Sequence, residues 1–594
     1  MSDETVCLQS IHFVLAANGF RRSASISKHI YGGVLSKSDL DFPIQIEIFD
    51  PFFVRKPDVI LLSKPDSLPT RLPHVFADKH LCYLDDQGAE FDRYDPVGNI
   101  TLVLASLHHL LDQYATKPEL LQQEFRRELP AYWQQNNEEL VYLAAESSKN
   151  IVYEYFHYLD PAGTKLGEII VADDATGTRD WRRKRQNAEQ IGTGHAVIVS
   201  LPTDIEIPDK DWPPTQFTHV AAWLKASGHQ ASYQRLVTQA FEHIATSSSC
   251  FFIFQLQGMF LGGLLSFRSN RSRRVIREKF KRTRPGRRGR QKKLDVPLHR
   301  KVSLLSSLQK YESADTFQRL NVRDVRASTV YTRNLVYERN LSTINIAVIG
   351  CGTLGGYVAS LLQHAGAGTG GGSLALYDAD ELHPENLGRH LLSSRYLGQN
   401  KATALATELN DNPPVGGCVH AIPSKVDPCE YEAFAKQYDL VVDTTGEITF
   451  STSLCHEAHR SEYMVPVLYG WIDAGGLAAR TLLDQPGSGL ACYACLKTRD
   501  STGKIGERFQ LFKNGVEIPS WQPRPCGIGG FLPFPTQASV TAAGLAQAQS
   551  LDWINNSPAP RFRHISLDPR ACDTKSADLK PLKECPCCQT EWHT

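Results

Sequence analysis

The sequence predicts a multidomain α/β protein. Its 594 residues exceed one domain of roughly 100 to 200 residues, and its 42% hydrophobic content is that of a globular chain. Strand-like and helix-like runs alternate, and from Asn345 the order is strand, glycine turn, helix, strand, which is typical of a parallel sheet with helical crossovers. We therefore expect domains at residues 1–145, 146–335 and 336–594.

The first region, residues 1–145, is predicted to be a small α+β unit. Ile44, Ile46 and Ile48 alternate as in a half-buried strand, and residues 99–114 place their apolar side chains on one helical face.

The central region, residues 146–335, is predicted to be an α/β linker domain, and it contains no functional motif. Residues 250–267 are uncharged and precede a basic run, as a membrane span would. Gln255, Gln257 and several glycines favour two buried strands instead, so we expect no membrane segment.

Charge is segregated along the chain. Lys plus Arg and Asp plus Glu both total 64, but residues 268–293 hold 14 basic residues and one acidic residue, which leaves 50 basic against 63 acidic residues elsewhere. We interpret this basic segment as a solvated linker or docking arm, with nucleic acid as the less favoured partner.

The N-terminus carries acidic residues and lacks the features of a signal peptide, so we expect a cytoplasmic protein. Its 14 cysteines should then be mostly reduced, and their clusters call for metal binding or nucleophilic chemistry as an explanation.

A nucleotide site is predicted after the strand that begins at residue 345. The turn contains Gly350, Gly352 and Gly355 and opens a helix, so its backbone can approach a phosphate or a ribose. The next strand ends at Asp378, which is placed to bind ribose hydroxyl groups. Beyond it follow an amide, a guanidinium and an ammonium group that suit a triphosphate better than a dinucleotide: Asn386, Arg389 and Lys401.

This pattern resembles the ThiF-type, ubiquitin-activating adenylation fold, a Rossmann-like domain. The resemblance covers the glycine turn, the D-x-D pair Asp378 and Asp380, and the spacing to Asn386, Arg389 and Lys401. It implies ATP and Mg²⁺ as cofactors, ribose binding by Asp378, phosphate binding by the amide and the two cations, and homodimers.

Two further nucleotide-site residues are inferred from the same resemblance. Arg333 lies upstream of the first strand, where family members often have an arginine that reaches ATP. The family's magnesium-binding Asp is replaced by Gly446, so we expect Asp443 or Glu447 to serve instead, because Mg²⁺ needs few protein carboxylates.

Two CxxC pairs predict a structural, four-thiolate Zn²⁺ site: Cys492, Cys495, Cys585 and Cys588. The resembling family also has two such pairs, and Cys587 could compete with Cys588 for the fourth position. Between the pairs, Cys526 follows a proline and precedes glycines, and it resembles the family's loop cysteine that accepts the activated carboxylate.

A second acyl-carrying cysteine is predicted in the first region, which resembles the ubiquitin-conjugating fold. Leu72-Pro73-His74 starts ten residues before Cys82, and Tyr94-Asp95-Pro96 precedes a helix, as in that family. His74 stands where the family has an oxyanion-stabilising Asn, and a histidine can donate the same hydrogen bond.

Together the outer regions resemble fusion proteins of bacterial anti-phage (CBASS) operons. The resemblance implies a ubiquitin-transferase-like enzyme that adenylates a protein C-terminus, carries it on Cys526 and then Cys82, and joins it to an acceptor amine. The implied substrate is a cGAS/DncV-like nucleotidyltransferase. Two alternatives are an activating enzyme for a separate ubiquitin-like or sulfur-carrier protein, and a non-catalytic nucleic-acid-binding scaffold.

Overall fold

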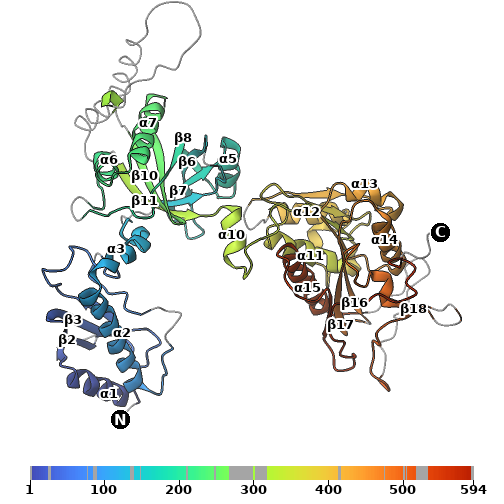
Figure 1. Ribbon diagram of the computed structural model, residues 1–594, viewed down its shortest axis with the longest axis horizontal. Coiled ribbons are helices and arrows are strands. Elements are labelled where there is room, and N and C mark those ends of the chain that lie inside the picture. The colour runs from blue at the N-terminus through green and yellow to red at the C-terminus, as the bar shows by residue number, and fades with distance from the viewer. Residues whose placement is uncertain are drawn as a thin grey trace, which may run out of the picture. The chain divides into compact units, whose positions relative to one another are not determined.

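The computed structural model forms two compact units, Met1–Asp324 and Val325–Thr594 (Figure 1). It describes residues 3–23, 29–76, 78–84, 90–133, 139–147, 149–208, 212–246, 249–266, 299–301, 317–411, 416–473, 475–499, 502, 505–516 and 533–589. The predicted nucleophile Cys526 and the basic segment 268–293 lie outside these residues.

The first unit begins with a four-stranded antiparallel sheet in the order β1-β2-β3-β4. Its strands are β1 (Arg21–Ser23), β2 (His29–Lys37), β3 (Leu40–Ile48) and β4 (Asp58–Leu61), and its helices are α1 (Asp3–Ala17) and α2 (Pro96–Thr116). Ile44, Ile46 and Ile48 are buried in one core with both helices, so the predicted strand alternation is confirmed. Helix α2 starts where Asp95 accepts a hydrogen bond from Gly98 N at 2.7 Å and Pro96 fixes the first turn.

Two short helices, α3 (Pro118–Arg127) and α4 (Leu129–Trp133), lead into a closed barrel in the order β10-β11-β5-β7-β6-β8-β9. Its strands are β5 (Glu139–Leu143), β6 (Val152–Leu159), β7 (Lys165–Ala172), β8 (Glu189–Ser200), β9 (Ser249–Leu256), β10 (Met259–Ser266) and β11 (Phe317–Asp324). Helices α5 (Ala175–Arg183), α6 (Phe217–Ala226) and α7 (Gln230–Thr246) connect them. Strand β5 pairs with β7 and β11, so the barrel starts before the predicted boundary at residue 146.

Within the uncharged stretch, the described residues 250–266 form two buried strands, as predicted. Strands β9 and β10 pair in antiparallel register, with Leu261 opposite Phe254. Within the part of the chain that the structure describes, no helix has the length and apolarity that a membrane crossing requires.

The second unit is built on a seven-stranded sheet in the order β14-β13-β12-β15-β16-β17-β20. These strands are β12 (Ile346–Ile349), β13 (Leu374–Tyr377), β14 (Val419–Ile422), β15 (Leu440–Asp443), β16 (Val467–Asp473), β17 (Ala478–Asp484) and β20 (Phe562–Ser566). Its α-helices are α10 (Ala327–Arg333), α11 (Thr353–His364), α12 (Lys401–Asp411), α13 (Tyr431–Ala435), α14 (Ile448–Arg460) and α15 (Thr536–Ile554). A separate hairpin pairs β18 (Lys497–Arg499) with β19 (Ile505–Glu507).

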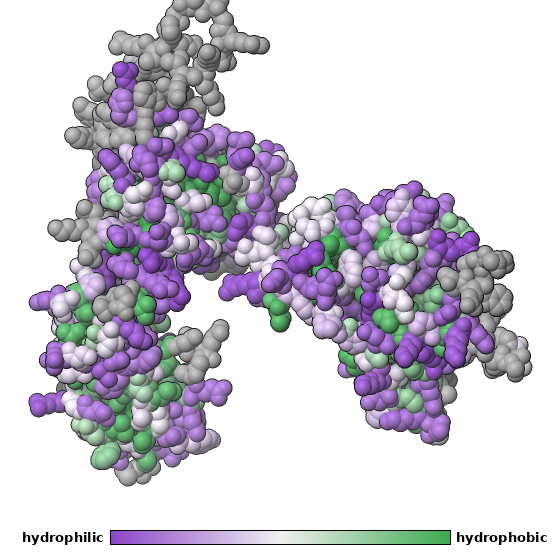
Figure 2. Space-filling view, viewed as in Figure 1, coloured by the Kyte–Doolittle hydropathy of each residue, from purple (hydrophilic) through white to green (hydrophobic). Residues whose placement is uncertain are grey.

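Helices cover both faces of this sheet, as expected for the predicted Rossmann-like domain. Along β12, Ile346 and Val348 face a core with α11, α12 and α15, whereas Ala347 and Ile349 face a core with α13 and α14. On the face drawn in Figure 2, both units show many hydrophilic residues, with hydrophobic residues between them.

Candidate functional site

The predicted nucleotide residues follow three neighbouring parallel strands. Strands β13 and β15 flank β12, and Ile349 at the end of β12 is level with Tyr377 on one side and Asp443 on the other. The glycine turn, Asp378 and Asp443 therefore lie along the carboxyl edge of the sheet, where the strand order reverses. Open α/β sheets bind their ligands at this position.

The glycine turn between β12 and α11 depends on glycine at two positions. Gly350 has a φ of +89°, in the left-handed region. A Cβ at Gly355 would lie 1.8 Å from the Gly350 carbonyl oxygen, so no larger residue fits. Gly352 caps α11 without a side-chain hydrogen bond and borders open space, which leaves the first amides of the helix accessible to an anionic ligand.

Asp378 is held against this turn. Its Oδ2 accepts a hydrogen bond from Cys351 N at 2.7 Å, and its Oδ1 accepts one from Asp380 N at 2.8 Å. Each carboxylate oxygen keeps a second acceptor position, so the anchored side chain can still bind ribose hydroxyl groups.

The predicted cations gather beside the turn. Lys401 begins α12, and its Nζ lies 3.1 Å from Asp380 Oδ2 with its side chain 12% exposed. Arg389 donates to Glu385 O at 3.4 Å and stacks over the Phe534 ring at 5.2 Å. Asn386 Oδ1 accepts a hydrogen bond from His383 N at 3.0 Å.

His390 is a site residue that the sequence analysis missed. It is buried, with Nε2 2.9 Å from Cys351 O, and it accepts Leu392 N on Nδ1 at 3.1 Å. Burial lowers the pKa of His390, and the nearby Lys401 and Arg389 charges act in the same direction. His390 fixes the segment after Arg389 to the glycine turn. Its place next to Arg389 in the sequence is the one feature that could have identified it as a site residue.

The two carboxylates proposed for magnesium differ in accessibility. Asp443 is buried, which raises its pKa, and its oxygens accept hydrogen bonds from Ser451 at 2.5 Å and Thr445 at 2.7 Å. Glu447 is exposed just beyond the same strand. Because a metal ligand needs an accessible oxygen, the geometry favours Glu447 over Asp443.

Arg333 lies at the end of α10 and is exposed. Tyr331 on the same helix lies near Gly366, which follows α11 at the end opposite the glycine turn. The geometry of the described residues therefore does not bring Arg333 to the nucleotide site within one chain.

The predicted thiol site in the first unit is assembled around Cys82, which is exposed. Cys82 N donates a hydrogen bond to His74 O at 2.8 Å, and Val75 pairs with Leu81, so the loop brings the two predicted residues together. His74 itself has a φ of +63°, and its backbone N donates to Glu128 Oε2 at 2.7 Å.

The His74 side chain is also paired with Glu128, through Nδ1 and Oε1. The hydrogen bond with Glu128 raises the pKa of His74 despite burial. Burial alone would raise the pKa of Glu128, but the hydrogen bonds from His74 outweigh it and the pKa is lowered. His74 also accepts the Cys82 backbone N–H on its carbonyl oxygen, and a protonated imidazole is able to donate a hydrogen bond to an oxyanion.

The four predicted zinc ligands converge in the second unit. Cys492 Sγ lies 3.8 Å from Cys495 Sγ and 3.5 Å from Cys585 Sγ, and Cys495 Sγ lies 3.5 Å from Cys588 Sγ. Ligands about 2.3 Å from a tetrahedral zinc ion are about 3.8 Å apart, so these side chains fit the ion. Their donor atoms lie within 4.8 Å of one another.

Comparisons with known proteins agree with this division of the chain. The ThiF family matches residues 328–587, and prokaryotic E2 family B matches residues 13–142.

Two curated relatives match nearly the whole chain, and both are ATP-dependent ubiquitin transferase-like proteins called Cap2. The Pseudomonas aeruginosa protein is 28% identical over 93% of each chain, and the Vibrio cholerae protein is 26% identical over 98% of this chain and 99% of its own. A crystal structure of E. coli MccB matches 42% of this chain and 68% of its own length, at 18% identity and a TM-score of 0.32. The chain is therefore a fusion of a ubiquitin-conjugating-like domain with a ThiF-like domain, and it is similar over almost its whole length to Cap2 proteins.

Proposed function

We propose that this ATP-dependent ubiquitin-activating and conjugating-like enzyme joins the C-terminus of a partner protein to an acceptor amine. The carboxylate attacks the α-phosphorus of ATP and pyrophosphate leaves. The Cys526 thiolate then displaces AMP, the Cys82 thiolate takes the acyl group from Cys526, and the acceptor amine takes it from Cys82. Each transfer forms one acyl bond and breaks one, and the thioesters keep the carboxyl group activated.

In the adenylation step, the carboxyl edge of the sheet orients ATP. Asp378 holds the ribose, and Asn386, Arg389 and Lys401 bind the phosphates and stabilise the charge that moves to pyrophosphate. Mg²⁺ neutralises phosphate charge when it is bound, and Glu447 is the accessible carboxylate that fits it. Lys401 must exchange its contact with Asp380 for a phosphate oxygen.

The position of Phe534 supports a role for Cys526 near this edge. Arg389 stacks on Phe534, and Thr536 Oγ1 donates to Gly388 O at 3.5 Å. Cys526 precedes Phe534 by eight residues. A chain of that length spans at most about 29 Å, so Cys526 can reach an activated carboxylate held at the nucleotide edge.

The observation that carries the proposal is the Cys82 site. An exposed thiol is fixed by a backbone hydrogen bond beside a histidine whose pKa is raised, on the same chain as an adenylation-type site. A buried thiol used only for packing needs neither feature.

The remaining features complete the proposal. Zn²⁺ bound by Cys492, Cys495, Cys585 and Cys588 would stabilise the fold rather than take part in catalysis, because four protein ligands leave no position for a substrate. We propose a cGAS/DncV-like nucleotidyltransferase as the partner, a cytoplasmic role in anti-phage defence, and a homodimer. Arg333 could then reach the nucleotide of the second copy.

The test is a non-reducing gel of the purified chain with ATP and a cGAS/DncV-like nucleotidyltransferase. We expect thiol-sensitive adducts that are lost in Cys526→Ala, and adducts restricted to Cys526 in Cys82→Ala. Cys418→Ser, which changes another exposed cysteine, should behave like the unmodified chain. Normal conjugate yield from the double variant Cys82→Ala and Cys526→Ala would rule out the two-thioester sequence.

Pyrophosphate exchange separates the alternatives. Stimulation only by a separate ubiquitin-like protein would replace the proposed partner. Absence of ATP binding together with salt-sensitive polyanion binding would replace the enzymatic function with a scaffold.

A further inference from the structure

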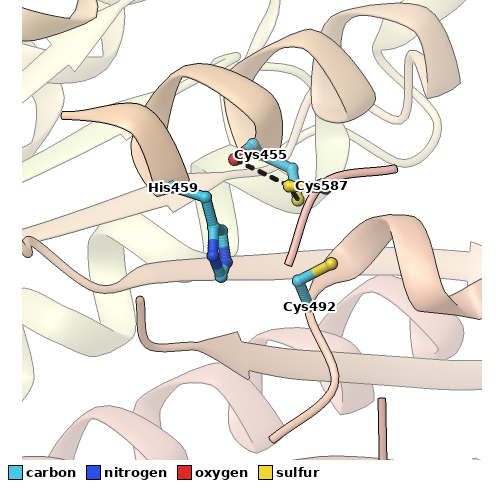
Figure 3. Close-up of side chains that lie close together, drawn as sticks. All are labelled: Cys455, His459, Cys492 and Cys587. Carbon is cyan, nitrogen blue, oxygen red and sulfur yellow. Dashed lines mark hydrogen bonds between the residues drawn. The ribbon is translucent and has the colours of Figure 1, made fainter. Parts of the chain in front are cut away.

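A second cluster of metal-binding side chains lies directly beside the predicted zinc ligands. We call Cys492, Cys495, Cys585 and Cys588 the first donor set, and Cys455, His459, Cys492 and Cys587 the second donor set (Figure 3). The donor atoms of each set lie within 4.8 Å of one another, and Cys492 belongs to both.

The second donor set combines residues from three separate elements. Cys455 and His459 are four residues apart on α14, so they lie on one face of that helix. Cys492 precedes the short helix at Tyr493–Leu496, and Cys587 lies in the C-terminal tail. Cys455 Sγ is 3.3 Å from Cys587 Sγ, and three of the four side chains are thiols suited to Zn²⁺.

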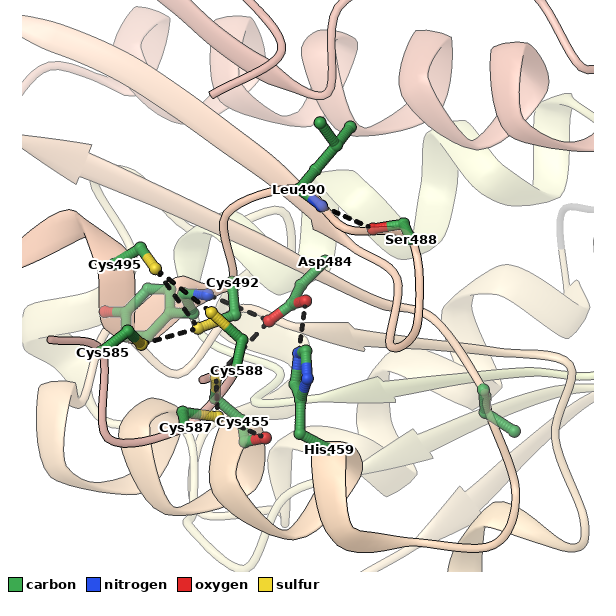
Figure 4. A network of polar contacts seen from close by, with 12 residues as sticks. Cys455, His459, Asp484, Ser488, Leu490, Cys492, Cys495, Cys585, Cys587 and Cys588 are labelled. Atoms are coloured by element: carbon green, nitrogen blue, oxygen red, sulfur yellow. Dashed lines mark hydrogen bonds and ion pairs between the residues drawn. The ribbon is translucent and has the colours of Figure 1, made fainter. Parts of the chain in front are cut away.

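Asp484, at the end of β17, contacts two members of the second donor set, His459 and Cys455 (Figure 4). Its Oδ1 lies 2.8 Å from His459 Nε2, which leaves Nδ1 with a lone pair when Nε2 carries the proton. Its Oδ2 accepts Tyr493 N at 2.9 Å and the Cys455 thiol at 3.4 Å, and zinc would replace that thiol proton. A carboxylate bonded to the second nitrogen of a histidine ligand is a common feature of zinc sites.

We propose that the second donor set binds a second Zn²⁺ ion, with Cys492 as a thiolate that bridges the two ions. Seven side chains then supply four ligands to each ion, because one sulfur is shared. The six thiolates exceed the charge of two zinc ions by two negative charges. The first ion ties the tail to the segment at Cys492, and the second ties the same tail to α14, so the pair fixes helix, loop and tail together.

The second ion should be the more accessible one. A hollow of about 320 Å³ is lined by Cys587 together with Cys429, His456 and Glu457. The first donor set contains three buried cysteines, Cys492, Cys495 and Cys585. A chelator entering through the hollow would therefore remove the second ion first.

Native mass spectrometry of the full chain, purified without added chelator and loaded with Zn²⁺, tests the proposal. We expect about two zinc ions per chain, released in two phases by a chromogenic chelator. One zinc ion per chain overturns the second site and leaves the first intact. No bound zinc, or a disulfide between Cys455 and Cys587 in the freshly purified protein, also overturns it.

Variants assign the ions to their donor sets. Cys455→Ser and His459→Ala should each retain about one zinc ion and lose the fast release phase. Cys429→Ser borders the same hollow without belonging to either set, and it should retain both ions. Two ions in Cys455→Ser and His459→Ala alike would contradict the proposal. Should these variants fail to fold, the zinc count and release phases of the unmodified chain still decide the question.

Discussion

Two cysteine sites of this chain, one in each unit, lie in opposite environments. Cys82 is exposed on a loop, and its backbone N donates a hydrogen bond to His74 O. In the second unit, Cys455, Cys492, Cys495 and Cys585 are buried with their sulfur atoms close together. An exposed thiol next to a proton donor is suited to nucleophilic attack, whereas buried thiols that converge are suited to holding an ion. The surroundings of the sulfur, rather than the residue type, decide its chemistry.

This comparison predicts that activity and stability separate between the units. A substitution at Cys82 should change the reaction and leave the fold intact. A substitution in the cysteine clusters should lower the stability of the fold before it changes the reaction. Three experiments examine this separation.

The largest effect is expected for Cys82→Ser. Conjugate formation should fall more than about a hundredfold, because an oxygen nucleophile forms a stable ester in place of a thioester. The free energy of unfolding should change by less than about 0.5 kcal/mol, since the side chain is exposed. Quantitative gels of conjugate and chemical denaturation measure the two results. A large loss of stability would show that Cys82 has a structural role like the clustered cysteines.

The next effect is on stability, for Cys495→Ser in the first donor set. Removing a ligand of a structural metal site should lower the stability of the second unit by at least about 3 kcal/mol, because the bound ion contributes directly to folding. Differential scanning calorimetry at a fixed scan rate should show its transition about 5 to 10 °C lower. Cys572→Ser lies outside both donor sets and serves as the control. An unchanged transition in Cys495→Ser would contradict a structural metal at this position.

The sequence predicted the features that depend on local spacing. Three such features are present in the structure: the glycine turn, the strand alternation at Ile44 to Ile48 and the two CxxC pairs. Each is defined by a few residues that are neighbours in the sequence. Local patterns follow from backbone geometry and ligand reach, which do not require the rest of the fold.

The features that the sequence analysis missed depend on contacts between distant residues. The barrel closes because Val322 of β11 pairs with Val141 of β5, and no periodicity within either strand specifies that partner. Cys455 and His459 read as ordinary helix residues until the tail brings Cys587 to within 3.3 Å of Cys455. His390 likewise acquires a role only through its contact with Cys351 O.

The smallest effect is expected from Glu128→Gln, which tests the role of the His74–Glu128 pair at the Cys82 site. Glu128 raises the pKa of His74, with a lesser contribution from Glu124. The transfer rate to Cys82 should rise with pH as the thiol ionises and fall as His74 loses its proton. In Glu128→Gln the pKa of His74 is lower, so the falling limb should move to lower pH.

The same pair makes a signed prediction about stability. The raised pKa of His74 contributes stability that is complete below the ordinary histidine pKa of about 6.5 and is lost as pH rises through the raised value. The lowered pKa of Glu128 contributes stability that is lost as pH falls through that lowered value. Glu128→Gln should therefore lower the free energy of unfolding by about 1 kcal/mol at pH values between the lowered pKa of Glu128 and the raised pKa of His74. Outside that range the loss should be smaller.

A matched control separates the effect of the His74–Glu128 pair from a general effect of changing a carboxylate near the Cys82 loop. Asp78 lies 3.0 Å from His80 Nδ1 in the same loop, but its side chain is 68% exposed, so solvent screens it. Asp78→Asn should leave both the pH profile of transfer and the denaturation midpoint unchanged. If Glu128→Gln changes only the denaturation midpoint, His74 positions the loop without acting on the oxyanion. A shifted falling limb at unchanged thiol ionisation is the result that a purely structural His74 would not produce.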